Sequence, residues 1–196
     1  MGTSINKRGR NSRIAKRAED GFSLLEVVIS MAVLTVGLVS LLGVFGLAMA
    51  STQTSQEDMI AKQLANEALE SIVTARNTSQ VTWAQVQNIA NGGIFLNGAN
   101  PIYLAGADGI VGTGDDAVAG VQTLTTPGAD GIFGTTDDVK IPLTAYQRTI
   151  LISPLFDAQG NPVTTLRGIN VSVQYATSQA RLPKTYVLSS FISQYR

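Results

Sequence analysis

The feature that most constrains this chain is an apolar run from Phe22 to Ala50, which contains one charged residue, Glu26, and no proline. About 20 consecutive apolar residues in a helix span a bilayer, so this run is long enough to cross a membrane with some tilt. It is also longer than the apolar core of an ordinary secretory signal. Because the rest of the chain supplies no further apolar helices to pack on it, we expect a single membrane span.

The charge ahead of this run predicts its orientation. Basic residues dominate residues 1–20, although the 196-residue chain as a whole balances 14 basic against 14 acidic residues. Positive flanks resist translocation, so we expect the N-terminal segment in the cytoplasm and the C-terminal two-thirds outside. A basic tail that binds nucleic acid is the alternative, but a neutral chain lacks the basic excess of such proteins, and we identify no specific nucleic-acid site. The basic residues are Lys7, Arg8, Arg10, Arg13, Lys16 and Arg17, against Glu19 and Asp20.

Composition argues against most kinds of enzyme. The chain has no cysteine and no histidine, which removes disulfides, thiol catalysis, histidine-based triads and most zinc, haem and iron–sulfur sites. No glutamate follows Glu70, so the C-terminal part of the chain cannot supply a glutamate to the carboxylate pair of a typical glycosidase. The aspartate pairs at 115–116 and 137–138 are adjacent in sequence, and their side chains diverge. We therefore expect a protein that is not an enzyme.

Glu26 is the residue of the apolar run that most needs a physical explanation. An ionised side chain at the centre of a bilayer costs about 2.5–3.5 kcal/mol on insertion scales, so the carboxylate needs either a partner or contact with the headgroups. The sequence offers no basic residue within helical reach on the apolar side. Gly37, Gly43 and Gly46 lie in the same run and would allow close approach of helices or bending. Both features favour a helix that packs against other copies of itself.

The string Gly21-Phe22-Ser23-Leu24-Leu25-Glu26-Val27, after a short basic segment and before the apolar run, resembles the class III signal of type IV prepilins. The continuation is most similar to PilV-type minor pilins, followed by the I-type minor pseudopilin of type II secretion. The resemblance implies that a membrane prepilin peptidase cuts between Gly21 and Phe22 and methylates Phe22 as the new terminus. It also implies that Glu26 pairs with the terminal amine of a neighbouring subunit, which would supply the missing partner.

Beyond the membrane, the helix is predicted to continue from Ser51 to Arg76, because this stretch lacks glycine and proline. Asp58 and Lys62 are spaced as an i,i+4 ion pair on it. A second short helix is expected from Trp83 to Ala90, capped by Thr82. One apolar stripe of the long helix is predicted to pack on a sheet; it consists of Ala61, Leu64, Ala65, Ala68, Leu69 and Ile72.

Residues 143–196 are predicted to form an antiparallel sheet. Alternating apolar and polar residues indicate strands at 148–153, 169–175 and 185–193, with a turn at 157–162. Three strands with one apolar face need a cover, and the helix stripe supplies it. The predicted fold class is therefore α+β, with one long N-terminal helix packed on a C-terminal antiparallel sheet and a Gly/Asp-rich region, 77–142, between them. This is also the pilin architecture.

Two 11-residue repeats lie in the Gly/Asp-rich region. Residues 106–116, GADGIVGTGDD, return as residues 128–138, GADGIFGTTDD. Short carboxylate side chains on a Gly-rich backbone suit a calcium site, although the spacing matches neither an EF-hand nor the calcium-binding nonapeptide repeat. The alternative is a pair of β-turns in each copy, with aspartate oxygens accepting backbone N–H groups. The candidate Ca²⁺ ligands are Asp108, Asp115, Asp116, Asp130, Asp137 and Asp138.

The sequence thus predicts a structural subunit of a type IV pilus or related filament, with a minor pilin that takes part in pilus assembly as the first hypothesis. The alternatives are a calcium-dependent, adhesin-like tip subunit and a minor pseudopilin of a type II secretion system. Expected partners are other pilin subunits, prepilin peptidase, the inner membrane and the pilus assembly platform. With the leader, residues 1–21, removed, the single-pass inner-membrane protein would enter an extracellular pilus or a periplasmic pseudopilus.

Overall fold

The computed structural model describes residues 21–177 and 182–195 and divides the chain into two compact units, Met1–Leu47 and Ala48–Arg196. The predicted leader therefore lies outside the described residues except for Gly21. The helix α1, Leu24–Asn77, contributes its apolar half to the first unit and the rest to the second. It is long and apolar enough to cross a membrane, and none of the side chains in its most apolar stretch is buried within the protein.

The second unit contains a four-stranded antiparallel sheet in the order β1-β4-β5-β6. The three predicted strands are present, and each is longer than the alternation indicated. The predicted turn joins β4 to β5, where the Asp157 Oδ1 accepts the backbone N–H groups of Gln159 and Asn161 at 2.9 and 2.8 Å. The strand bounds are Ala99–Pro101 for β1, Tyr146–Phe156 for β4, Pro162–Tyr175 for β5 and Lys184–Ser193 for β6.

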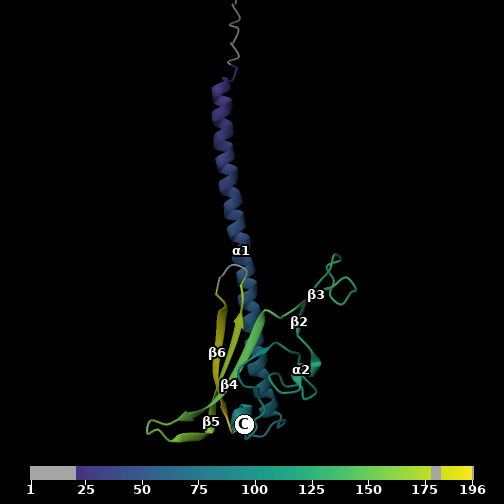
Figure 1. Cartoon of the computed structure of the whole chain (residues 1–196), viewed down its shortest axis with the longest axis vertical. Coiled ribbons are helices and arrows are strands. Elements are labelled where there is room, and N and C mark those ends of the chain that lie inside the picture. Colours follow the sequence, from purple (N-terminus) through teal and green to yellow (C-terminus); the bar gives the residue numbers. More distant parts are fainter. Residues whose placement is uncertain (1–20, 178–181, 196) are drawn as a thin grey trace, which may run out of the picture. The chain divides into compact units, whose positions relative to one another are not determined.

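One face of this sheet packs on α1, as the predicted stripe required (Figure 1). Every second residue of β4 and β5 is buried along most of their paired length, and the helix residues Ala61, Ala65, Ala68 and Ile72 have no exposed surface. The α+β fold with a long N-terminal helix on an antiparallel sheet is therefore confirmed. The buried residues on the sheet side include Ile150, Ile152, Ile169, Val171, Val173 and Tyr175.

The Gly/Asp-rich region also contributes to the core, which its composition did not indicate. Phe95 and Ile102 have no exposed surface, and Ile110 and Val111 are 3% exposed. The same region forms the short strand β1 and a separate two-stranded sheet. The further elements are the 3-10 helix η1 at Ile89–Asn91, α2 at Asp116–Ala119, β2 at Thr123–Thr126 and β3 at Val139–Pro142.

The helix predicted from Trp83 to Ala90 is wrong. The segment forms consecutive turns and then η1, and the Gln85 side chain accepts the backbone N–H of Thr82 at 2.8 Å. Asn88 has an extended backbone, with φ −70° and ψ 155°, and its side chain binds β4. These long-range bonds replace the local ones of a helix, so tertiary contacts override helix propensity here.

The predicted ion pair between Asp58 and Lys62 is replaced by a longer-range contact. Asp58 accepts hydrogen bonds from the Tyr175 hydroxyl at 2.6 Å and from the Lys184 ammonium at 3.2 Å. The Tyr175 ring stacks on Tyr146, with ring centroids 5.6 Å apart. The Tyr175 bond, aided by Lys184, lowers the pKa of Asp58. Asp58 therefore ties α1 to β5 and β6 instead of supporting the helix alone.

Candidate functional site

The predicted processing site occupies the first described residues. Gly21 and Phe22 lie in a non-helical segment before α1, and Phe22 is 81% exposed. The Ser23 hydroxyl oxygen accepts the backbone N–H of Glu26 at 3.2 Å, and the Ser23 carbonyl accepts that of Val27 at 3.2 Å. Ser23 is thus the N-cap of α1, in the Ser-x-x-Glu spacing typical of helix starts. Sequence reasoning missed this cap, although the spacing of Ser23 and Glu26 could have revealed it.

This cap has two consequences for chemistry. The Gly21–Phe22 peptide bond lies outside the helix, in the exposed segment before α1. Glu26 lies in the first turn, where a carboxylate interacts favourably with the helix dipole. Its side chain is exposed and forms no ion pair with any other described residue of the chain. The carboxylate is therefore available to a cation from outside the chain.

The first repeat is built around Asp116. Its side chain is 2% exposed and accepts backbone N–H groups from Gly106 at 3.0 Å, Gly112 at 2.5 Å and Thr113 at 3.3 Å. A buried carboxylate with several N–H donors is well satisfied without a cation. Asp116 therefore acts as the acceptor that folds residues 106–113 around itself.

Asp108 and Asp115 complete the same loop. Asp108 accepts the N–H of Ile110 at 2.8 Å and donates its own N–H to Asp115 at 3.1 Å. The Thr113 hydroxyl donates to Asp115 at 2.7 Å. This hydroxyl bond, followed by the backbone bond, lowers the pKa of Asp115. The predicted turns with aspartate oxygens accepting backbone N–H groups are thus present.

The three aspartates of the first repeat also lie close enough to share a cation. Asp108, Asp115 and Asp116 each offer an oxygen, and these oxygens are within 4.8 Å of one another. Carboxylate oxygens are the ligands that Ca²⁺ prefers. Among the described residues, this is the one place where three acidic side chains converge in this way. The calcium hypothesis therefore keeps a geometrical basis in the first repeat and stays a prediction.

The second repeat has similar internal bonds without that convergence. Asp130 accepts the N–H of Ile132 at 2.8 Å and donates its own to Asp137 at 3.2 Å. Asp138 accepts the N–H of Gly134 at 2.7 Å. The bond from the Thr135 hydroxyl is the main cause of the lowered pKa of Asp137. The two copies therefore fold alike, but only the first gathers its three carboxylates within the described part of the chain.

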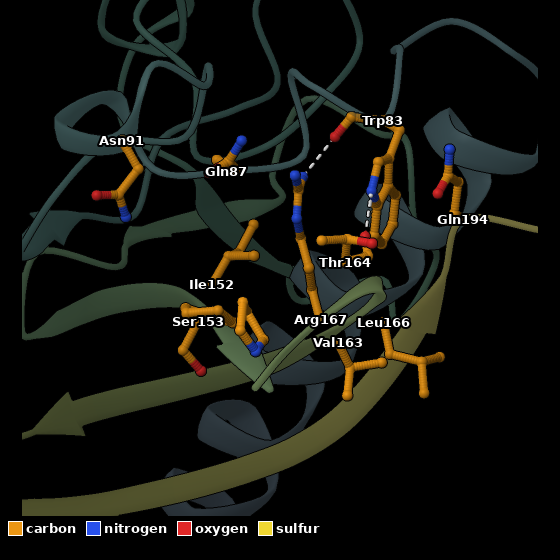
Figure 2. A pocket seen from close by; sticks show the side chains of 12 residues that line it. Trp83, Gln87, Asn91, Ile152, Ser153, Val163, Thr164, Leu166, Arg167 and Gln194 are labelled. Atoms are coloured by element: carbon orange, nitrogen blue, oxygen red, sulfur yellow. Dashed lines mark hydrogen bonds between the residues drawn. The ribbon is translucent and has the colours of Figure 1, made fainter. Parts of the chain in front are cut away.

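A groove of about 780 Å³ lies beside Trp83, and sequence reasoning did not find it (Figure 2). The Trp83 indole N–H donates to the Thr164 carbonyl at 2.9 Å. The Arg167 guanidinium lies 4.2 Å from the indole centroid and donates to the carbonyls of Trp83 and of Val86, the latter at 2.6 Å. No sequence pattern connects these residues, because the turn at 82–87 and the N-terminal part of β5 come together only in the folded chain.

Positive charge collects at this groove without an acidic counterpart. Partial burial lowers the pKa of Arg167, and the Arg76 guanidinium lies 6.0 Å from the Trp83 ring centroid. Neither guanidinium forms an ion pair with another described residue, and the residues lining the groove include no acidic side chain. The groove therefore combines apolar and polar walls with a guanidinium that has no acidic partner among the described residues.

Residues 16–42 match the prokaryotic N-terminal methylation motif, which is that of type IV pilin-like prepilins. The match includes Gly21, Phe22 and Glu26 and the first turns of α1. No curated protein and no solved structure matches the chain. The motif points to a structural subunit and implies prepilin peptidase and other pilins as partners, whereas the PilV-type assignment has no relative to support it.

Proposed function

We propose that this chain, which carries the prokaryotic N-terminal methylation motif, is a structural subunit of a type IV pilus or related filament. The precursor is cut between Gly21 and Phe22, and the new amine of Phe22 is methylated. The motif at residues 16–42 is the observation that carries the proposal. The exposed, non-helical Gly21–Phe22 bond and the apolar helix that begins at Leu24 support it.

In this proposal, the chain begins as a single-pass inner-membrane protein with its leader in the cytoplasm, residues 22–50 in the membrane and residues 51–196 outside. During assembly, Glu26 of one subunit pairs with the terminal amine of the next. The exposed carboxylate in the first turn of α1, with no ion pair among the described residues, supports this role. A charge buried between apolar helices needs such a partner.

The intact mass of the protein from membranes tests the proposed processing. Cells with and without prepilin peptidase should differ, because only the first should contain a chain that starts at Phe22 and carries one additional methyl group. Gly21→Val should leave the precursor uncut in the presence of the peptidase, and Gly37→Ala is the matched control that should be processed normally. An uncut chain in both strains would contradict the proposal.

Within this class we propose a minor subunit that takes part in pilus assembly. Its basis is the resemblance, drawn from the sequence, of the apolar run after Glu26 to PilV-type minor pilins. Deletion of the protein should reduce the number of filaments, whereas loss of an adhesin-like tip subunit would leave filaments that no longer attach. A periplasmic pseudopilus subunit would instead affect secretion, with surface filaments unchanged. Electron microscopy and secretion assays on one deletion strain therefore separate the three roles.

The converging carboxylates of the first repeat support a second candidate, a calcium-dependent tip function. Calcium should then raise the melting temperature of the full chain in detergent, and EGTA should reverse the change. Asp115→Asn should remove the effect, whereas Asp137→Asn, at the corresponding position of the second repeat, should retain it. Identical melting temperatures with calcium and with EGTA would contradict calcium binding and leave turn formation as the only role of these aspartates.

A further inference from the structure

The two repeats fold alike at the level of the backbone. Gly109 and Gly131 both have φ of 69°, and Gly112 and Gly134 have φ of 88° and 87°. These positive angles favour glycine, so the repeated sequence enforces the same turns twice. The matching aspartate bonds fix each loop from within. The second repeat is therefore a folded loop in its own right.

The surroundings of the two loops differ sharply. Ile110 and Val111 of the first repeat are 3% exposed, whereas Ile132 and Phe133 at the same positions of the second are 61% and 67% exposed. A methyl group added at Gly112 would lie 2.4 Å from the Ile150 side chain, but nothing lies within 4 Å of the equivalent point at Gly134. The first loop uses its apolar pair to pack on its own domain, and the second leaves that pair uncovered.

The second loop is also acidic. Residues 128–138, which we call the tip, join β2 to β3 and contain Asp130, Asp137 and Asp138 but no basic residue. None of these aspartates forms an ion pair with another described residue. The Asp138 Oδ1 is shielded from solvent and has no hydrogen-bond partner. Figure 1 shows the loop between β2 and β3 standing clear of β4, β5 and β6. This loop thus presents two adjacent exposed apolar side chains beside carboxylates that have no cationic partner among the described residues.

The groove beside Trp83 has the complementary chemistry. Its lining includes the apolar side chains of Ile152, Val163 and Leu166, and Figure 2 shows Arg167 lying between Ile152 and the Trp83 indole. Arg167 has no acidic partner among the described residues, and no acidic side chain lines the groove. An apolar pair flanked by carboxylates could pack its apolar side chains on the apolar part of the groove and place its carboxylates near the Arg167 guanidinium.

We propose that the tip of one copy of this chain docks in the Trp83 groove of a second copy. Ile132 and Phe133 would enter between the apolar walls, and the aspartates would lie near Arg167. The contact joins two different patches, so it is heterologous and can repeat from subunit to subunit in an open, helical array. The inference rests on the proposed filament subunit, and within the minor-subunit role it requires at least two copies of this chain to lie next to each other in the filament.

Cysteine crosslinking of the full chain tests this contact cleanly, because the protein has no native cysteine. Two singly substituted copies, Phe133→Cys and Val163→Cys, are produced together in cells that assemble filaments and are then oxidised. A disulfide between them can form only between molecules. We expect at least fivefold more disulfide-linked dimer from this pair than from either variant alone.

Matched pairs control for random collision. Val118→Cys, at an exposed position of α2, replaces the tip variant, and Leu151→Cys, at an exposed position of β4, replaces the groove variant. Equal dimer yields from the test and control pairs would overturn the proposal. Disulfide products that join Phe133→Cys mainly to a different protein would also overturn it, because another partner would then cover the tip.

A second variant needs no crosslink. Phe133→Ser changes an exposed residue, so the chain should fold and reach the membrane at normal levels, but it should reduce recovery of the protein in sheared filaments at least fivefold. Val118→Ser is the control, and unchanged recovery of Phe133→Ser would overturn the docking. The intact-mass measurement separates the docking from the proposed function. Normal processing at Phe22 with no specific dimer would contradict the docking and leave the proposed function standing.

Discussion

At the scale of single residues, the side-chain amide of Asn88 replaces a missing strand neighbour of β4. Its Nδ2 donates to the Ile150 carbonyl at 2.7 Å and to the Leu96 carbonyl at 3.1 Å, and its Oδ1 accepts the Ile152 N–H at 2.8 Å. Asn88 is 3% exposed, so water cannot replace these bonds. A buried backbone group left without a partner costs about 1–3 kcal/mol.

We therefore expect Asn88→Ala to lower the free energy of unfolding by about 2–4 kcal/mol. Asn88→Asp keeps the shape and the acceptor but loses the donor and buries a charge, so it should be at least as destabilising. Asn91→Ala changes an exposed amide of η1 and is the control, with an expected effect below about 0.5 kcal/mol. Urea unfolding of the full chain in detergent measures all three, and a loss below about 1 kcal/mol for Asn88→Ala would contradict the role.

Asp116 and Asp138 occupy the same position of the two repeats and provide a matched comparison. Asp116 is 2% exposed and accepts three backbone N–H groups, whereas Asp138 accepts one in an exposed loop. Asp116→Ala should therefore lower the free energy of unfolding by about 2 kcal/mol or more. Asp138→Ala should cost less than half as much, because water reaches the freed N–H. Equal losses in thermal or urea unfolding would show that burial of the first repeat contributes little.

At the scale of elements, the contact between α1 and the strands β5 and β6 predicts a response to acid. Asp58 accepts bonds from Tyr175 and Lys184, and these bonds lower its pKa in the folded protein. A depressed carboxyl pKa stabilises the fold above the unfolded value of about 3.9, and this stabilisation is lost as pH falls through the folded pKa. The contribution should therefore be complete near neutral pH, begin to weaken near about pH 4 and be lost as pH falls below the lowered pKa of the folded protein.

Asp58→Asn tests this contact. The variant should be less stable than the parent at pH 7, and the difference between the two should shrink on acidification to pH 3, because the parent loses its ionised acceptor. Glu70→Gln removes a carboxylate from an exposed position of the same helix and serves as the control. Free energies of unfolding at several pH values give the result, and a difference that stays constant with pH would contradict it.

The elements that local periodicity encodes were predictable, and those that depend on distant contacts were not. The alternation around Val171 and the stripe containing Ala65 indicated the sheet, the helix and their packing, because each pattern lies within one element. Phe95 carries no periodic neighbours, and Asn88 is polar, so neither suggested a core position. The candidate sites divide in the same way. The processing motif is contiguous and was therefore predictable, whereas the Trp83 groove joins segments about 80 residues apart and was not.

At the scale of the whole molecule, the chain combines a membrane-competent helix with a folded C-terminal domain, and Glu26 is the residue that distinguishes an anchor from an assembly element. A plain anchor has no use for an ionised side chain in its first apolar turn. A filament subunit does, because the helix exchanges lipid for sister helices, and the carboxylate then compensates the terminal amine of a neighbour. Glu26 is thus unfavourable in a helix surrounded by lipid and favourable in a helix packed against a sister subunit with a free terminal amine.

Replacement of this residue separates insertion from assembly. Glu26→Leu should enter the membrane at least as well as the parent chain, because it removes an unfavourable charge from the apolar run. It should nevertheless fail to enter filaments, because the amine of the neighbouring subunit would be buried without a partner. Membrane fractionation and shearing of surface filaments measure the two steps, and Glu70→Leu, outside the motif, is the control that should assemble. Normal filaments from Glu26→Leu would contradict the pairing and leave the apolar helix as an anchor only.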